Sequence, residues 1–174
     1  MKKGQQKKQE KALKKRVESK LERKAERQII ALGKKYIVQQ ARNYPIEGCW
    51  IRADWQKAGI TPVFVTRRQP NGNVLFGCYM VDLYCLGVKD AFWRSDVPPA
   101  AFKRDVMGKS FAETTPLEIS VDMAHEIVYG GLEYAASLGF KPHPDFELAQ
   151  YVLDPPDAHP RSGNVEFVDD GKPL

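Results

Sequence analysis

The first quarter of the chain carries a helical pattern of apolar and polar positions. Residues 5–43 are mostly strong helix formers, and the first proline of the chain, Pro45, follows shortly after them. Apolar residues at intervals of four predict a thin stripe along one helix: Leu13, Val17, Leu21 and Ala25. The apolar content rises from Ile29 onward. We therefore expect the second half of this helix to pack on a core and the first half to project into solvent.

The pattern changes to that of β-strands between residues 48 and 88. Residues 62–68 are rich in β-branched and aromatic side chains, which favour strands. Residues 74–86 are almost continuously apolar, as expected of a strand that is covered on both faces. Asn71 and Gly72 lie between these two segments, and an Asn-Gly pair in that position predicts a β-hairpin.

The C-terminal half contains one strong helix pattern. Ser120 is a suitable N-terminal cap for a helix that runs to Leu138, and Gly139 suits the left-handed position that ends such a helix. Weaker patterns predict short helices over residues 99–107 and 145–153 and a strand over residues 164–168. Loops are expected over residues 93–99 and 108–116.

These elements predict an α+β fold. We expect a small, mainly antiparallel sheet of three or four strands with a central hairpin, packed against helices and preceded by a long basic N-terminal helix. The change in composition along the chain divides it into a basic helical arm, residues 1–28, and a compact α+β domain, residues 29–174.

Positive charge is concentrated in the arm. The whole chain carries a net charge of +5. Residues 1–27 contain twelve Lys or Arg and four Glu, a net charge of +8, which leaves −3 for the remaining residues. Such an asymmetry indicates a polyanionic partner or an anionic membrane surface. The apolar stripe of the arm lacks Trp and Phe, which argues against the membrane surface.

The basic residues of the arm predict contact with a nucleic-acid backbone. Neutralisation of phosphates by Lys and Arg gives salt-sensitive binding that does not depend on base sequence. The residues predicted to bind nucleic acid are Lys7, Lys8, Lys11, Lys14, Lys15, Arg16, Lys20, Arg23, Lys24 and Arg27, together with Arg67 and Arg68 beside the hairpin turn. Two alternatives stay open for the same arm: a solvated helix that keeps the chain soluble, and contact with an acidic protein partner.

An enzymatic alternative begins with a carboxylate in an apolar strand. Asp82 lies within residues 74–86, and a buried carboxylate needs a partner or a raised pKa. The structural interpretation is an ion pair with Arg52 or Lys89, or a hydrogen bond from a backbone amide. The functional interpretation is a hydrolase site, for which the candidate catalytic residues are Asp82, His125, His143 and Asp145.

No sequence motif indicates a metal or a cofactor. His125 and the following glutamate begin like a zinc-protease helix, but Tyr129 stands where the second histidine is required. Residues 108–110 (Gly-Lys-Ser) resemble the end of a phosphate-binding loop, but Lys103 stands where that loop needs glycine. A Gly-x-Ser-x-Gly nucleophile elbow is also lacking. We therefore expect neither a metal nor a cofactor.

The cysteines and the apolar runs predict a cytoplasmic protein without a membrane span. Cys49, Cys78 and Cys85 lie in apolar surroundings, which is typical of buried reduced thiols. No apolar run approaches the roughly 18 residues that a transmembrane helix needs. The polar N-terminal sequence Met-Lys-Lys-Gly-Gln-Gln does not have the pattern of a secretory signal.

Several distinctive segments of the domain are similar to a family of uncharacterised bacterial proteins. They are residues 67–73, residues 81–91 (VDLYCLGVKDA), residues 129–135 and residues 138–146 (LGFKPHPDF). The chain resembles this family over about residues 35–174. The family has no established activity, so the resemblance implies no catalytic residue, and it does not extend to the lysine-rich arm.

The charge of the arm and the lack of a catalytic motif favour one function over two others. We predict a non-catalytic accessory protein that binds nucleic acid or a ribonucleoprotein through its basic N-terminal helix. The first alternative is the hydrolase with a site around Asp82 and His125 or His143. The second alternative is a protein-interaction subunit of a larger mobile-element or defence complex, in which the arm meets an acidic protein surface.

Overall fold

The computed structural model describes residues 2–167 of the chain, with side chains from residue 15 onward. The chain divides into two units, Met1–Tyr36 and Ile37–Leu174, and each is described by itself. The fold is α+β, as the sequence predicts, with a long N-terminal helix and a five-stranded antiparallel sheet packed against helices.

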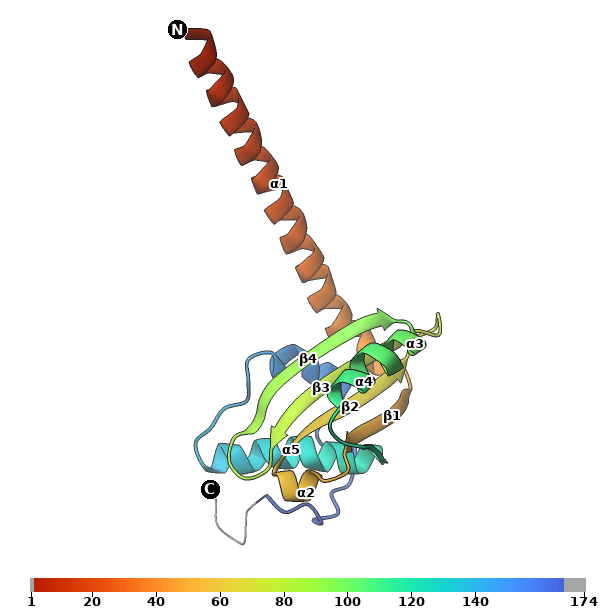
Figure 1. The fold of residues 1–174 in the computed structure, drawn as a ribbon. Helices are drawn as coiled ribbons and strands as arrows, with labels where there is room; N and C mark the ends of the chain where they lie inside the picture. Colours follow the sequence, from red (N-terminus) through yellow and green to blue (C-terminus); the bar gives the residue numbers. More distant parts are fainter. Residues whose placement is uncertain (1, 168–174) are drawn as a thin grey trace. The chain divides into compact units, whose positions relative to one another are not determined.

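The first unit is a single helix. α1 (Lys2–Gln40) runs through this unit without a break (Figure 1). Ile29 and Leu32 are 70% and 67% exposed, so the expectation that the chain packs on a core from Ile29 onward is wrong for this stretch. A rise in apolar content leads to burial only where a face of the helix meets other elements, and Ile37 and Ala41 are the first residues that do so. Within residues 2–167, no helix combines the length and the apolarity needed to cross a membrane.

The second unit is built on one antiparallel sheet with the strand order β4-β3-β2-β1-β5. The strands are β1 (Ile46–Arg52), β2 (Ile60–Arg68), β3 (Val74–Asp82), β4 (Gly87–Val97) and β5 (Pro116–Ile119). The helices and helical turns are η1 (Ala41–Asn43), α2 (Trp55–Ala58), α3 (Pro99–Ala101), η2 (Phe102–Met107), α4 (Gly108–Ser110), α5 (Val121–Ser137), α6 (Phe146–Ala149) and η3 (Gln150–Val152).

The two strongest local predictions are confirmed. β2 and β3 form the hairpin, with Arg68 opposite Val74, and Gly72 takes a φ of 83° in the turn between them. Ser120 caps α5, because its hydroxyl oxygen accepts a hydrogen bond of 3.2 Å from the Met123 amide. Gly139 has a φ of 88° just beyond the end of that helix.

The sheet has two more strand segments than the sequence predicts, and it lacks one that was predicted. Residues 93–97 were expected to be a loop but belong to β4, and β5 is a strand of four residues that begins at the end of the predicted loop 108–116, where no strand was predicted. Both segments lie on the outer strands of the sheet, where exposed side chains weaken the apolar pattern. Residues 164–167 were expected to be a strand, but they have no strand structure.

Both faces of the sheet are covered, as the apolar run in β3 predicts. Leu75 and Tyr79 point to the main core beneath α5 and α6, whereas Phe76 and Cys78 point to a smaller cluster under the helical segment 99–110. Figure 1 shows α5 on one face of the sheet, with α3 and α4 over the other. The main core therefore lies between the sheet and α5, and that helix carries the titratable groups described below.

Gly87, at the start of β4, packs directly against α5. Its φ is 61°, and an added Cβ atom would lie 2.5 Å from the Gly131 carbonyl oxygen and 2.9 Å from the Ala135 Cβ atom. We expect Gly87→Ala to lower the free energy of unfolding by about 3 kcal/mol, through a left-handed backbone penalty and an overpacked contact. Urea denaturation measures this loss.

A matched control separates the two causes. Gly139 also has a left-handed φ, but nothing lies within 4 Å of the point that an added Cβ atom would occupy. Gly139→Ala is therefore expected to cost only the backbone penalty of about 1–2 kcal/mol. Equal losses from the two substitutions would show that the contact with α5 contributes nothing.

Candidate functional site

The described part of the arm places five of its six basic residues on one face of α1; the sixth, Lys15, was predicted to bind nucleic acid but lies among the glutamates on the other side. At 3.6 residues per turn the five occupy about 100° of the helix circumference and share a surface, the basic face: Arg16, Lys20, Arg23, Lys24 and Arg27. All of these side chains are exposed. The acidic residues of the same stretch lie on the other side of the helix: Glu18, Glu22 and Glu26.

The basic face has free positive charge. Within residues 15–167, none of its five side chains forms an ion pair. Lys34 continues the same face toward the end of the first unit and is also exposed. The side chains of Lys7, Lys8, Lys11 and Lys14 were predicted to bind nucleic acid, but they lie outside the described side chains. The interface is therefore argued from residues 15–36.

The predicted contribution of Arg67 to this interface is wrong. Its side chain is only 2% exposed. Its guanidinium donates hydrogen bonds to the Val152 carbonyl oxygen at 2.6 Å, to the Tyr44 carbonyl oxygen at 2.6 Å and to Asp154 Oδ1 at 2.5 Å. Arg68 is exposed and forms an ion pair with Glu47. Arg67 is thus a structural residue, because each arm of its guanidinium is already occupied inside the domain.

A second group of polar side chains meets where α5 faces the segment after η3. We call it the histidine–aspartate cluster, and its members are Asp122, His125, Asp154 and His159. The imidazole of His159 is bonded at both nitrogens, with Nδ1 2.7 Å from Asp122 Oδ1 and Nε2 2.8 Å from Asp154 Oδ2. The rings of His125 and His159 lie 4.3 Å apart. The Asp154 amide donates a hydrogen bond of 3.3 Å to His125 Nε2.

The two histidines of the cluster have opposite electrostatics. Burial lowers the pKa of His125 to about 4, and the neighbouring charge of His159 adds to this effect. Burial would also lower the pKa of His159, but hydrogen bonds to Asp154 and Asp122 outweigh it and raise the pKa. The pKa of Asp154 is lowered: burial alone would raise it, and the hydrogen bonds from His159 and Arg67 reverse the effect. At neutral pH His125 is therefore a neutral imidazole.

His125 is incompletely hydrogen-bonded. It is 2% exposed, and its Nδ1 atom has no hydrogen-bond partner within the described residues. Since Nε2 accepts the hydrogen bond from the Asp154 amide, the ring proton of the neutral imidazole is on Nδ1. A buried donor without a partner costs about 1–3 kcal/mol. Few buried polar groups of folded proteins lack a partner in this way.

Glu126 ties the segment after His159 to the same helix. It is 4% exposed, and its carboxylate accepts hydrogen bonds from the Ser162 amide at 3.0 Å, from the Ser162 hydroxyl at 2.6 Å and from the Val165 amide at 3.4 Å. Burial alone would raise the pKa of Glu126, but these hydrogen bonds lower it. Arg161 forms an ion pair with Glu133, about two turns after Glu126 on α5.

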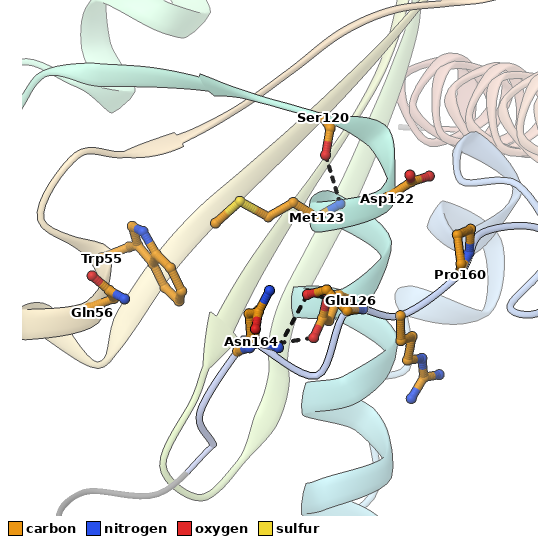
Figure 2. A pocket seen from close by; sticks show the side chains of 11 residues that line it. Trp55, Gln56, Ser120, Asp122, Met123, Glu126, Pro160 and Asn164 are labelled. Atoms are coloured by element: carbon orange, nitrogen blue, oxygen red, sulfur yellow. Dashed lines mark hydrogen bonds between the residues drawn. The ribbon is translucent and has the colours of Figure 1, made fainter.

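A cavity of about 480 Å³ opens beside this segment. Figure 2 shows Trp55 and Gln56 of α2 on one side, with Glu126 of α5 and Asn164 of the C-terminal segment facing them. The acidic groups of the cavity are already bonded, Glu126 to Ser162 and Asp122 to His159. The lining therefore supplies no uncommitted carboxylate for acid–base chemistry.

No known protein family, curated protein or solved structure matches this chain. We therefore infer function from the side chains of this chain.

The candidate hydrolase residues lie in separate settings. Asp82 Oδ1 accepts hydrogen bonds from the Tyr84 amide at 3.0 Å and the Cys85 amide at 3.1 Å, so this carboxylate stabilises the turn between β3 and β4. His143 is near Asp145 and Asp90, at 3.8 and 3.9 Å, in an exposed group. His125 belongs to the histidine–aspartate cluster. His143 and Asp145 are brought together, whereas Asp82 is bonded to its own turn.

Two of the three thiols are poor candidates for a nucleophile. Cys49 and Cys78 are buried, and burial raises the pKa of each thiol to about 12. At neutral pH both therefore remain protonated, and a protonated thiol is a poor nucleophile. All three cysteines are free, but the prediction of buried thiols is confirmed only for Cys49 and Cys78, since Cys85 is half-buried.

Asp122, Asp154 and His159 were not recognised in the sequence. They have no mutual spacing that resembles a ligand or catalytic motif, because His159 lies 37 residues from Asp122. One signal was present: the segment Asp154-Pro155-Pro156, between a short helix and a polar tail, contains two residues that restrict the backbone. Two consecutive prolines predict a rigid turn, but they do not predict that this turn packs against α5.

Proposed function

We propose that the chain is a non-catalytic accessory protein that binds nucleic acid, or a ribonucleoprotein, through the basic face of α1. The observation that carries this proposal is the gathering of five of the six described Lys and Arg of residues 15–27, all exposed and unpaired, on one side of a long helix. Such a face can neutralise several phosphates of one backbone at once. The basic residues beyond it, Lys7 to Lys14, would add to the same electrostatic attraction.

The distribution of charge supports a role for the arm rather than the domain. The residues after position 27 have a net charge of −3, so the domain as a whole repels a polyanion. Arg16 to Lys34 span 18 residues, or about 27 Å along the helix axis, which approaches one turn of a nucleic-acid duplex. Long flexible side chains at this spacing position a backbone and carry no base readout.

One observation favours the second candidate, a protein-interaction subunit. Apolar side chains lie beside the basic face and are exposed: Val17, Leu21 and Leu32 at 51%, 62% and 67%. An acidic amphipathic helix of a partner protein would match both the charge and the apolar side chains. The two candidates differ in their response to nuclease, because only the nucleoprotein partner is lost when nucleic acid is digested.

The first test is a salt titration of the full chain. We expect a fluorescently labelled duplex to bind at 50 mM salt, with log K falling linearly against log salt with a slope of about −3 to −5. Fluorescence anisotropy measures the binding constant for single-stranded and double-stranded RNA and DNA. Similar slopes for unrelated sequences are expected, since the contacts are to phosphates.

The matched control is Arg104→Gln, which removes an exposed positive charge of the domain and leaves the arm unchanged. This variant is expected to bind with an unchanged salt slope. If the full chain shows no association with any of these oligonucleotides at low salt, the proposal fails. Binding that survives high salt without weakening would also contradict it, because phosphate neutralisation cannot produce it.

A further inference from the structure

The histidine–aspartate cluster brings three potential metal ligands, two imidazoles and one carboxylate, to one point of the domain. One ligand atom each from His125, Asp154 and His159 lies within 4.8 Å of the other two. Ligands bonded to one metal at about 2.0–2.2 Å lie roughly 3–4 Å apart, so small side-chain adjustments close the difference. His125 comes from α5, and the other two come from the segment after η3.

We propose that His125, Asp154 and His159 form a binding site for a divalent transition-metal ion of the zinc type. Two imidazole nitrogens and one carboxylate oxygen are a donor set that zinc and neighbouring metals prefer. The hard cations magnesium and calcium favour oxygen ligands throughout, so the two nitrogens disfavour them. Three protein ligands leave a fourth position for water.

The groups around His159 and Asp154 are arranged as in metal centres. Asp122 Oδ1 lies 2.7 Å from Nδ1 of His159, so a carboxylate orients the ring and leaves Nε2 to face Asp154. Arg67 holds Asp154 through Oδ1 at 2.5 Å, so the carboxylate is fixed with Oδ2 on the side of His159. Asp122 and Arg67 therefore hold the outer atoms of His159 and Asp154, and the ligand atoms Nε2 and Oδ2 point into the cluster.

His125 is the second, independent observation. It is buried beside the other ligands, one ring nitrogen has no partner within residues 15–167, and the other has only a long bond of 3.3 Å. The lone pair of Nε2, held only by this long hydrogen bond, is therefore available to a metal ion, while the ring proton stays on Nδ1. The site is reachable from solvent, because the side chains of His159 and Asp154 are 18% and 27% exposed.

Binding replaces two hydrogen bonds by three metal bonds, because His125 Nε2 gives up the hydrogen bond from the Asp154 amide when it coordinates the ion. Without metal, the proton between His159 Nε2 and Asp154 Oδ2 joins the two side chains at 2.8 Å. When the ion enters, that proton leaves to solvent, and both atoms bond the metal. The ion would link α5 to the segment that ends the described chain, so the site has a structural consequence that does not depend on the proposed function of the arm.

The test uses the full chain, freed of metal with EDTA and desalted. We expect isothermal titration with zinc chloride to show one ion per chain, and cobalt chloride to give visible absorption bands of a site with nitrogen and oxygen ligands. His159→Asn is expected to weaken zinc binding by at least tenfold. The matched control is His143→Asn, which alters the exposed group of Asp90, His143 and Asp145 and should leave the binding constant unchanged.

Two results overturn the proposal: no zinc binding by the wild-type chain, or equal binding by wild type and His159→Asn. Loss of binding in His143→Asn alone would assign the ion to the exposed group instead and would also overturn it. If circular dichroism shows that His159→Asn does not fold, zinc binding by Asp122→Asn is measured instead. Asp122 is a positioning residue, and its loss should weaken zinc binding by about 10–100-fold while the ligand atoms remain.

Discussion

Replacing the five residues of the basic face by glutamine should lower the affinity of the chain for a nucleic-acid duplex by several hundredfold at 0.1 M salt. If about three of them contact phosphates at one time, each contributes about 0.9 to the slope of log K against log salt. The slope should therefore become shallower by about 3. Glutamine keeps the helix propensity close to that of Lys and Arg, so α1 should persist.

The control variant changes the acidic residues of the same helix. Glu18, Glu22 and Glu26 occupy the other side of α1 and are changed to glutamine in a second variant. Affinity should stay the same or rise modestly there, because these carboxylates repel phosphates. Anisotropy titrations at several salt concentrations measure both variants, and circular dichroism reports the helix. If the wild type and the basic-face variant bind with equal affinity, the basic face does not bind nucleic acid and the proposed function is contradicted.

Local patterns were sufficient to predict the elements whose signals lie within a few residues. The hairpin follows from Asn71 and Gly72 between two apolar runs, and α5 follows from its cap at Ser120 and its apolar face. The outer strands were missed because their alternation is weak: β5 has three exposed residues of four. Such a strand is stabilised by backbone pairing with β1, and the sequence of β5 does not contain that information.

The burial of Arg67 was predictable, although its basic neighbours suggested otherwise. Side chains alternate along a strand, so Arg67 shares a face with Val63 and Val65, and all three are buried. Charge type favoured the surface, while parity favoured the core. The sequence could not show the carboxylate that makes burial possible, since Asp154 lies 87 residues away and approaches only through the folded chain.

The histidine–aspartate cluster was beyond sequence analysis for the same reason. In the sequence, His125 looks like the start of a zinc-protease helix that lacks its second histidine. Such a motif places both histidines on the same helix. The structure instead brings the second and third ligands from the segment after η3. A metal site assembled from a helix and a distant turn has no fixed sequence spacing between its ligands. The expectation of no metal was based on the lack of such a spacing, and this site does not require one.

Arg67→Met should lower the free energy of unfolding by about 3–5 kcal/mol, the largest stability loss that we expect from a single substitution in this chain. Methionine nearly fills the volume, but it donates no hydrogen bond. The carbonyl oxygens of Val152 and Tyr44 and the carboxylate of Asp154 each lose a donor. Removing one partner of a buried ion pair costs more than the pair contributes, because the remaining charge is left in a poorly solvated place.

The measurement is urea denaturation in EDTA, so that a bound metal does not contribute to stability. Arg68→Met is the matched control: the neighbouring arginine is exposed, its ion pair with Glu47 is at the surface, and its loss should cost less than about 1 kcal/mol. The double substitution Arg67→Met with Asp154→Asn removes the stranded charge together with its partner. It should be less destabilising than the sum of the two single substitutions, because each single change breaks the same pair. If Arg67→Met and Arg68→Met prove equally mild, the guanidinium does not anchor the segment of Val152 and Asp154 to the sheet, and the position of the histidine–aspartate cluster would need another cause.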